Sequence, residues 1–128
     1  MKKNPSAAFL VLRLGLGFVF IWFAFAQFGS PAKWVSFLPS FLSSSTAFAT
    51  SFILMNALFE LVAGVLIILG AWTRLAGVLL ALHLFGIAFT IGMTAVGVRD
   101  IGLAVATLAL AIGGAGNFSI DAKAEALV

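Results

Sequence analysis

The chain has 128 residues, enough for one compact unit, and its composition excludes an ordinary soluble domain. Hydrophobic residues make up 63% of the sequence and charged residues 9%, whereas soluble globular proteins average about 45–50% and about 25%. The net charge is +3, but the basic residues are scattered singly along the chain, which excludes a nucleic-acid partner. We therefore expect an integral membrane protein whose surroundings are the lipid bilayer.

Four apolar stretches are separated by short polar joints, at residues 7–28, 47–70, 75–93 and 98–116. A helix needs about 20 residues to span a bilayer, and lipid admits only structures that satisfy their own backbone hydrogen bonds. The pattern predicts an all-α fold, a bundle of four transmembrane helices in a single domain over residues 1–128. The tail from Asn117 onward is polar.

The first joint, residues 29–46, predicts a short helix lying at the membrane interface. Ser30 followed by Pro31 is typical of a helix start. Apolar side chains then recur at helical spacing, at Trp34, Phe37, Leu38 and Phe41. Such an amphipathic pattern is typical of helices that lie in the interface, and Pro39 is expected to break this one.

The basic residues of the joints predict how the bundle is oriented. One side carries Lys2, Lys3, Arg74 and Lys123, and the other side carries Lys33 and Arg99. Because cytoplasmic loops carry the excess of lysine and arginine, we expect both termini on the cytoplasmic side.

A few polar side chains fall at membrane depth, where ionisable groups are costly unless they are paired. Glu60 and His83 lie at nearly equal distances from the cytoplasmic ends of their helices, and Asn56 shares a helical stripe with Glu60. The long side chain of Arg13, on the first helix, can reach the same layer. The sequence predicts an intramembrane cluster of Arg13, Asn56, Glu60 and His83, in which Arg13 pairs with Glu60.

This cluster has two interpretations. It is either an ion pair that fixes the register of the helices, or a site where Glu60 and His83 exchange protons or bind a polar head group. A second candidate site, on the periplasmic side, consists of Gln27, Arg99 and Asp100. Zinc usually takes three or four protein ligands, so we expect no metal site.

Aromatic residues are concentrated on the first helix, at Phe18, Phe20, Trp22, Phe23, Phe25 and Phe28. Aromatic walls suit a quinone ring, and the alternative is that these side chains face lipid. The sequence has no cysteine, which removes disulfides, thiolate metal sites and iron–sulfur clusters from this chain. We expect no autonomous enzyme and no resident cofactor, with a quinone as the candidate ligand.

Three parts of the sequence carry a family resemblance. They are Arg13-Leu14-Gly15-Leu16-Gly17, Glu60 to Gly64 with Leu69-Gly70 and Thr73-Arg74, and Arg99-Asp100 with Gly114-Ala115-Gly116-Asn117-Phe118-Ser119-Ile120-Asp121. Together they resemble the DoxX family of small bacterial four-helix membrane proteins. The chain departs from that pattern at Gln27, where lysine is frequent, and at Ala24, where glycine is frequent.

The resemblance implies a bundle with cytoplasmic termini in the bacterial inner membrane. It also implies a redox-associated or quinone-linked membrane subunit, or an anchor for a soluble oxidoreductase, since relatives include subunits of a thiosulfate:quinone oxidoreductase. The expected partners are the bilayer and either a soluble oxidoreductase or further copies of the chain. The alternatives are a non-enzymatic assembly factor or scaffold, and a small proton or solute transporter that uses Glu60 and His83.

Overall fold

The computed structural model describes residues 3–128, so that Lys2, counted above among the basic residues of one side, lies outside the described residues. Its long helices are α1 (Pro5–Gly29), α2 (Thr46–Leu69), α3 (Thr73–Ile91) and α4 (Ala95–Gly113). All four are long and apolar enough to cross a membrane. The chain is therefore an all-helical, multi-pass membrane protein, and each helix begins and ends within three residues of the predicted limits.

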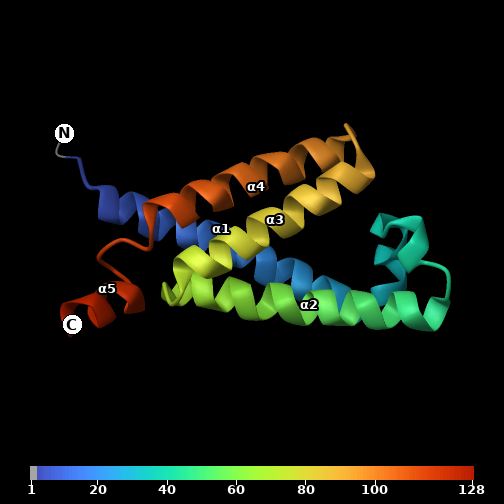
Figure 1. Cartoon of the computed structure of the whole chain (residues 1–128), viewed down its shortest axis with the longest axis horizontal. Coiled ribbons are helices and arrows are strands. Elements are labelled where there is room, and N and C mark those ends of the chain that lie inside the picture. The colour runs from blue at the N-terminus through green and yellow to red at the C-terminus, as the bar shows by residue number, and fades with distance from the viewer. Residues whose placement is uncertain (1–2) are drawn as a thin grey trace.

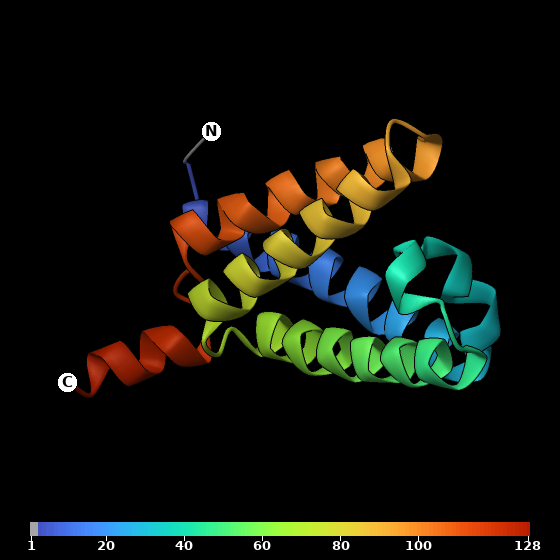
Figure 2. The ribbon, with the colours of Figure 1, turned by 45° about the vertical axis from the view of Figure 1, so that its right-hand side comes forward.

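The bundle consists of two helical hairpins, because α1 packs along α2 and α3 packs along α4 (Figure 1). Both termini lie at one end of the bundle, called here the terminal end, and the joint between α1 and α2 lies at the other, called the distal end. The α3–α4 hairpin diverges from α2 toward the distal end (Figure 2). This divergence leaves room between the hairpins in the distal half of the molecule.

The joint at the distal end forms two short 3-10 helices, η1 (Pro31–Phe37) and η2 (Ser40–Leu42). The sequence predicts one amphipathic helix broken at Pro39, and the break lies where it was predicted. Leu38 has an extended backbone, with φ −79° and ψ 147°, because a following proline disfavours the helical conformation. The joint packs against α1, α2 and α3, so it covers the open end of the bundle.

A short helix that the sequence did not predict, α5 (Ile120–Ala126), follows α4. The hydroxyl of Ser119 caps it by accepting the backbone N–H of Ala122 at 3.1 Å, and Asp121 lies in its first turn. Serine at the cap and an acid in the first turn are favourable at a helix start. Ser119 and Asp121 are therefore the two residues from which a helix start in the polar tail could have been predicted.

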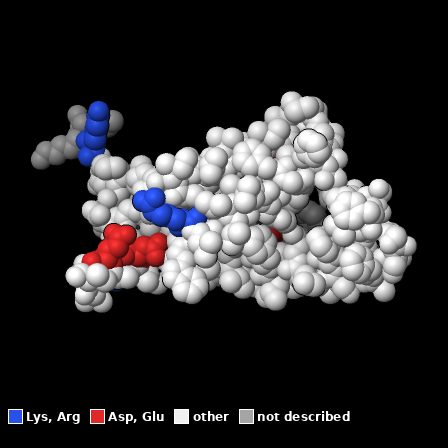
Figure 3. Space-filling model, viewed as in Figure 1, with Lys and Arg blue, Asp and Glu red and all other residues white. Residues whose placement is uncertain are grey.

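The hydrophobic core fills the middle of the bundle and its terminal half. It consists of buried side chains from all four long helices: Leu16, Phe20, Ala63, Ile67, Ala76, Leu80, Leu84, Ala104 and Leu110. Outside the core, most large exposed side chains are apolar, and charged side chains gather at the terminal end in Figure 3. Such a surface fits a bundle surrounded by lipid.

Candidate functional site

A cavity of about 370 Å³ lies between the two hairpins in the distal half. Its walls come from all four long helices and from both 3-10 helices of the joint. The surface is hollowed beside the lobe that the joint forms (Figure 3). Toward the terminal end the cavity meets the hydrophobic core, where Phe20 and Leu84 belong to both. It is therefore a pocket in one half of the bundle, and the core closes its inner end.

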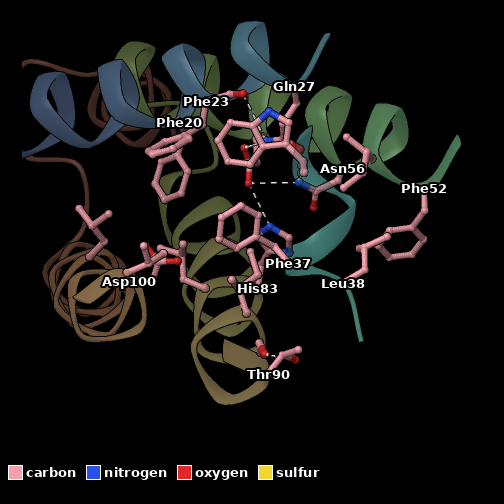
Figure 4. A pocket seen from close by; sticks show the side chains of 18 of the residues that line it. Phe20, Phe23, Gln27, Phe37, Leu38, Phe52, Asn56, His83, Thr90 and Asp100 are labelled. Carbon is pink, nitrogen blue, oxygen red and sulfur yellow. Dashed lines mark hydrogen bonds and ion pairs between the residues drawn. The ribbon is translucent and has the colours of Figure 1, made fainter. Parts of the chain in front are cut away.

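The carboxylate of Glu60, on α2, is buried in the wall of this cavity, with 4% of the residue exposed. Gln27 Nε2 donates to Glu60 Oε2 at 2.7 Å. Asn56 Nδ2 donates to Glu60 Oε1 at 3.3 Å and to Gln27 Oε1 at 2.7 Å. His83 Nε2 lies 3.1 Å from Glu60 Oε1 (Figure 4). The Glu60 cluster, as we call these four residues, joins α1, α2 and α3.

The hydrogen bonds assign the roles of the polar atoms in this cluster. An ionised carboxylate only accepts hydrogen bonds, so the contact with Glu60 requires the proton of His83 on Nε2. Both carboxylate oxygens of Glu60 are then engaged. The ring of His83 also packs edge-on against Phe59, with ring centroids 5.3 Å apart. The carboxylate and the imidazole are thereby held in one orientation.

Asp100, on α4, lines the same cavity together with Arg99. Arg99 Nε and Nη2 donate to Asp100 Oδ1 at 2.9 and 2.8 Å. The guanidinium also lies over the ring of Phe23, 5.1 Å from its centroid, a cation–π geometry. The side chain of Arg99 is 47% exposed and that of Asp100 is 6% exposed. Arg99 therefore lies at the edge of the cavity, and Asp100 lies deeper.

The structure thus rearranges the two sites that the sequence suggested. It brings Asn56, Glu60 and His83 together, as the sequence predicts. Gln27, which the sequence places in a separate periplasmic-side site with Arg99 and Asp100, hydrogen-bonds Glu60 directly. Because Arg99 and Asp100 line the same cavity, the two candidate sites are parts of one pocket.

The aromatic wall of the cavity comes from α1 and from the joint. Trp34 packs edge-on against Phe23 and lies against Phe37, with ring centroids 5.6 Å apart in both pairs. Of the six aromatic residues at positions 18–28 of α1, Phe20 and Phe23 line the cavity. The others point outward and are exposed: Phe18, Trp22, Phe25 and Phe28. These four side chains therefore face lipid, which was the alternative. The other aromatic residues of the cavity wall come from the joint, which the sequence had assigned to the membrane interface.

Arg13 does not belong to the Glu60 cluster, and the predicted pairing of Arg13 with Glu60 is wrong. Its guanidinium is buried and donates to four backbone carbonyls, at distances of 2.6–2.9 Å. The acceptors are Ile67 and Ile68 at the end of α2, and Ala115 and Phe118 after α4.

The reason for this correction lies at the end of α2. The last four carbonyls of a helix have no partner within the helix, and the helix dipole makes that end negative. A long cationic side chain is favoured there, so Arg13 extends toward the terminal end and away from the middle of the membrane. Every residue type has a backbone carbonyl, so no residue pattern in the sequence could have predicted these partners.

A second polar assembly forms around Asp121 at the terminal end. Its Oδ1 accepts the backbone N–H of Trp72 at 2.8 Å, and its Oδ2 accepts that of Thr73 at 2.9 Å. The backbone N–H of Asp121 donates to the carbonyl of Gly70 at 2.8 Å. Gly70 has φ +68°, and a Cβ there would lie 2.8 Å from the guanidinium of Arg13, so glycine is needed. We call Arg13, Gly70, Thr73 and Asp121 the terminal junction.

The terminal junction also sets the ionisation of Asp121, which lies outside the membrane-spanning helices. Burial raises the pKa of its carboxyl. The hydrogen bonds from Thr73 and Trp72 and the positive charge of Arg13 lower that pKa by more, so it lies below its usual value. Asp121 is thus held as a carboxylate.

Within residues 3–128 no three histidine, cysteine or acidic side chains come close enough to hold a metal ion. The polar groups of the cavity are hydrogen-bond donors and acceptors. Two carboxylates, an imidazole, two amides, a guanidinium and a threonine hydroxyl line a pocket that is otherwise aliphatic and aromatic. Pockets of this composition and size are typical of small-molecule sites.

The fold and the cavity define a small multi-pass helical membrane protein with a polar cluster buried beside an aromatic pocket. The DoxX family matches residues 8–93, more than half of the chain, and the protein belongs to this family. The matched segment contains the whole Glu60 cluster and Arg13, whereas Asp100 and Asp121 lie beyond it. No curated protein and no solved structure matches the chain.

Proposed function

We propose that this protein binds a quinone in its cavity and serves as the membrane subunit of a quinone-linked oxidoreductase. The observation that carries the proposal is the Glu60–His83 pair, 3.1 Å apart, in the wall of a cavity that also contains Phe23, Trp34 and Phe37. A quinone needs an apolar slot for its ring and hydrogen-bonding groups for its oxygens. The cavity offers both.

The aromatic wall accounts for ring binding. Phe23, Trp34 and Phe37 form a continuous set of packed rings along one side of the cavity. Aromatic rings prefer edge-on or offset stacking, at about 0.5–1.5 kcal/mol beyond the burial of their area. The cavity volume of about 370 Å³ falls within the range of about 300–1,000 Å³ that is usual for ligand pockets.

The Glu60–His83 pair accounts for proton exchange. His83 Nε2 is committed to Glu60, and within the described residues Nδ1 has no hydrogen-bond partner. A charged imidazolium donates from Nδ1 to a quinone oxygen, and a neutral ring accepts there from a quinol hydroxyl. His83 can therefore give up a proton when a quinone is reduced and take one when a quinol is oxidised.

Electrons must come from a partner chain. The sequence has no cysteine and a single histidine, so it cannot supply the ligands of an iron–sulfur cluster or of a haem held by two histidines. A soluble oxidoreductase that docks on the bundle fits this requirement. The protein then provides the quinone site and the membrane anchor.

The proposed location is the bacterial inner membrane, with the terminal end in the cytoplasm. Lys3, Arg74 and Lys123 belong to segments at the terminal end, while Lys33 and Arg99 belong to segments at the distal end. The excess of basic residues marks the cytoplasmic side. The cavity then lies in the periplasmic half of the membrane.

The test is quinone binding by the purified protein in mild detergent. A short-chain benzoquinone is titrated while the fluorescence of Trp34 is followed, with Trp34→Phe to identify its contribution. We expect binding by the parent chain and about tenfold weaker binding by His83→Leu, the equivalent of about 1.4 kcal/mol. Glu125→Gln, an exposed substitution on α5, is the control and should bind as the parent does.

Two outcomes would contradict the proposal. One is a parent chain that binds no quinone, which favours a scaffold in which the Glu60 cluster only specifies packing. The other is equal binding by the parent and His83→Leu.

Proton flux into liposomes without any quinone would instead favour the transporter alternative. That alternative uses the same pair but needs a second conformation in which the core at the inner end of the cavity opens.

A further inference from the structure

One oxygen of Asp100 is left without a partner inside the cavity. Both hydrogen bonds from Arg99 fall on Oδ1, and no group in residues 3–128 donates to Oδ2. The side chain is only 6% exposed and lines the cavity. In the view of Figure 4, Asp100 lies on the opposite side of the cavity from Asn56. Thr73 Oγ1 is the one fully enclosed side-chain polar atom without a partner in residues 3–128, so Asp100 Oδ2 is still accessible from the cavity. This oxygen therefore marks a position where a ligand is expected to donate.

The two carboxylates of the cavity differ in this respect. Glu60 accepts hydrogen bonds on both oxygens, from Gln27, Asn56 and His83. Asp100 has one oxygen engaged and one free. Arg99 donates two hydrogen bonds to Asp100, and a carboxylate is an acceptor only. Asp100 Oδ2 therefore favours a ligand atom that carries a hydrogen.

This requirement separates the two redox forms of a quinone. The oxidised form has carbonyl oxygens, which are acceptors only, and such an oxygen facing Asp100 Oδ2 would place two acceptors together. The reduced form has hydroxyl groups, and a hydroxyl that donates to a carboxylate makes a charge-assisted hydrogen bond. We infer that the cavity selects the hydroquinone over the quinone, and that Asp100 is the residue that determines this selectivity. The inference rests on the proposed quinone site.

The experiment compares three ligands that share one ring. They are a short-chain benzoquinone, its hydroquinone and the dimethyl ether of that hydroquinone, which keeps the oxygens but cannot donate. Dissociation constants are measured by anaerobic calorimetry on the full chain in detergent. We expect the hydroquinone to bind about tenfold more tightly than either of the other two. Asp100→Leu should reduce this ratio to nearly one, and Glu125→Gln should leave it unchanged.

The outcomes separate this inference from the proposed function. Equal affinity for all three ligands, or a preference that persists in Asp100→Leu, overturns the selectivity and leaves quinone binding intact. Binding of none of them by the parent chain overturns both. If Asp100→Leu does not fold, the ratio between hydroquinone and quinone on the parent chain decides, because these two share every heavy atom and only the hydroquinone can donate.

Discussion

The carboxylate of Asp121 caps a helix that begins 48 residues earlier in the chain, because its Oδ2 accepts the backbone N–H of Thr73 at 2.9 Å. Trp72 occupies the cap position of α3, and an indole has no acceptor for the N–H groups of the first turn. Asp121 supplies that acceptor from α5. The turn between the two hairpins and the segment after α4 are thereby joined.

Removal of this cap should destabilise the fold. Asp121→Ala leaves the N–H groups of Trp72 and Thr73 without their acceptor, and loss of a helix cap costs about 0.5–2 kcal/mol. Thermal unfolding in detergent, followed by circular dichroism, measures the effect. Glu125→Ala, also on α5, is the control because the side chain of Glu125 is exposed and, within residues 3–128, makes no hydrogen bond or ion pair. If the two variants unfold at the same temperature, the cap does not contribute to stability.

The contribution of Asp121 should depend on pH. Its pKa is lowered in the folded protein, whereas in the unfolded chain it returns to about 3.9. The stability that the carboxylate confers is therefore complete above about pH 4 and is lost as the pH falls through the lower folded pKa. The difference in unfolding free energy between the parent and Asp121→Asn should be constant from about pH 5 to 7 and shrink toward pH 3. A difference that does not change with pH would contradict the ionised state of Asp121.

Arg13 and Glu60 should act independently of each other. Arg13→Leu leaves backbone carbonyls at the end of α2 and after α4 without donors, at about 1–3 kcal/mol for each buried group, so we expect a loss of about 3 kcal/mol or more. Because Arg13 and Glu60 share no partner, the double variant Arg13→Leu/Glu60→Leu should equal the sum of the single losses within about 0.5 kcal/mol. Denaturant unfolding of the four chains measures this. If the double variant lost less stability than that sum, Arg13 and Glu60 would interact as the sequence suggested.

The contact between α1 and α2 should tolerate a larger side chain at Gly15 but not at Gly17. A Cβ at Gly17 would collide with the side chain of Ile68 and lie 3.0 Å from the carbonyl oxygen of Gly64, whereas one at Gly15 meets nothing within 4 Å. Gly17→Leu should cost about 1–3 kcal/mol through overpacking. Gly15→Leu should remain within about 0.5 kcal/mol of the parent. Equal melting temperatures for both variants would mean that α1 packs with a different face.

The orientation can be read from single cysteines in this cysteine-free chain. Ser44, in the joint, and Glu125, on α5, are both exposed and lie at opposite ends of the bundle. In intact cells an impermeant maleimide should label Ser44→Cys and spare Glu125→Cys, and lysis should make the two equal. The opposite pattern would place the termini outside, and the cavity would then lie in the cytoplasmic half.

The sequence predicted the helices well and the contacts of their polar residues less well. The apolar runs define α1 to α4 because a spanning helix must be long and apolar along its whole length. Asn56, Glu60 and His83 could be placed together because depth in a membrane follows from position along a helix. Gln27 was assigned to the outer end, but its side chain is buried and donates to Glu60, so it lies inside the bundle.

Other features depend on tertiary contacts for which a single sequence has no signal. Arg13 has only backbone partners, which any residue type can provide. The cap that Asp121 gives to α3 joins segments far apart in the chain. Asp100 and the Glu60 cluster line one cavity because of the angle between the hairpins, which helix periodicity does not determine.

The hydrogen bonds of Arg13 have a consequence for the biogenesis of the protein. A chain is synthesised from its N-terminus, so α1 emerges from the ribosome first and carries the guanidinium toward the membrane. Two of its acceptors, the carbonyls of Ala115 and Phe118, are translated 102 and 105 residues later. Until then α1 holds a cation with half of its final partners missing, and water or lipid headgroups must solvate it. The full set of hydrogen bonds of Arg13 can therefore form only after the segment that follows α4 has been translated.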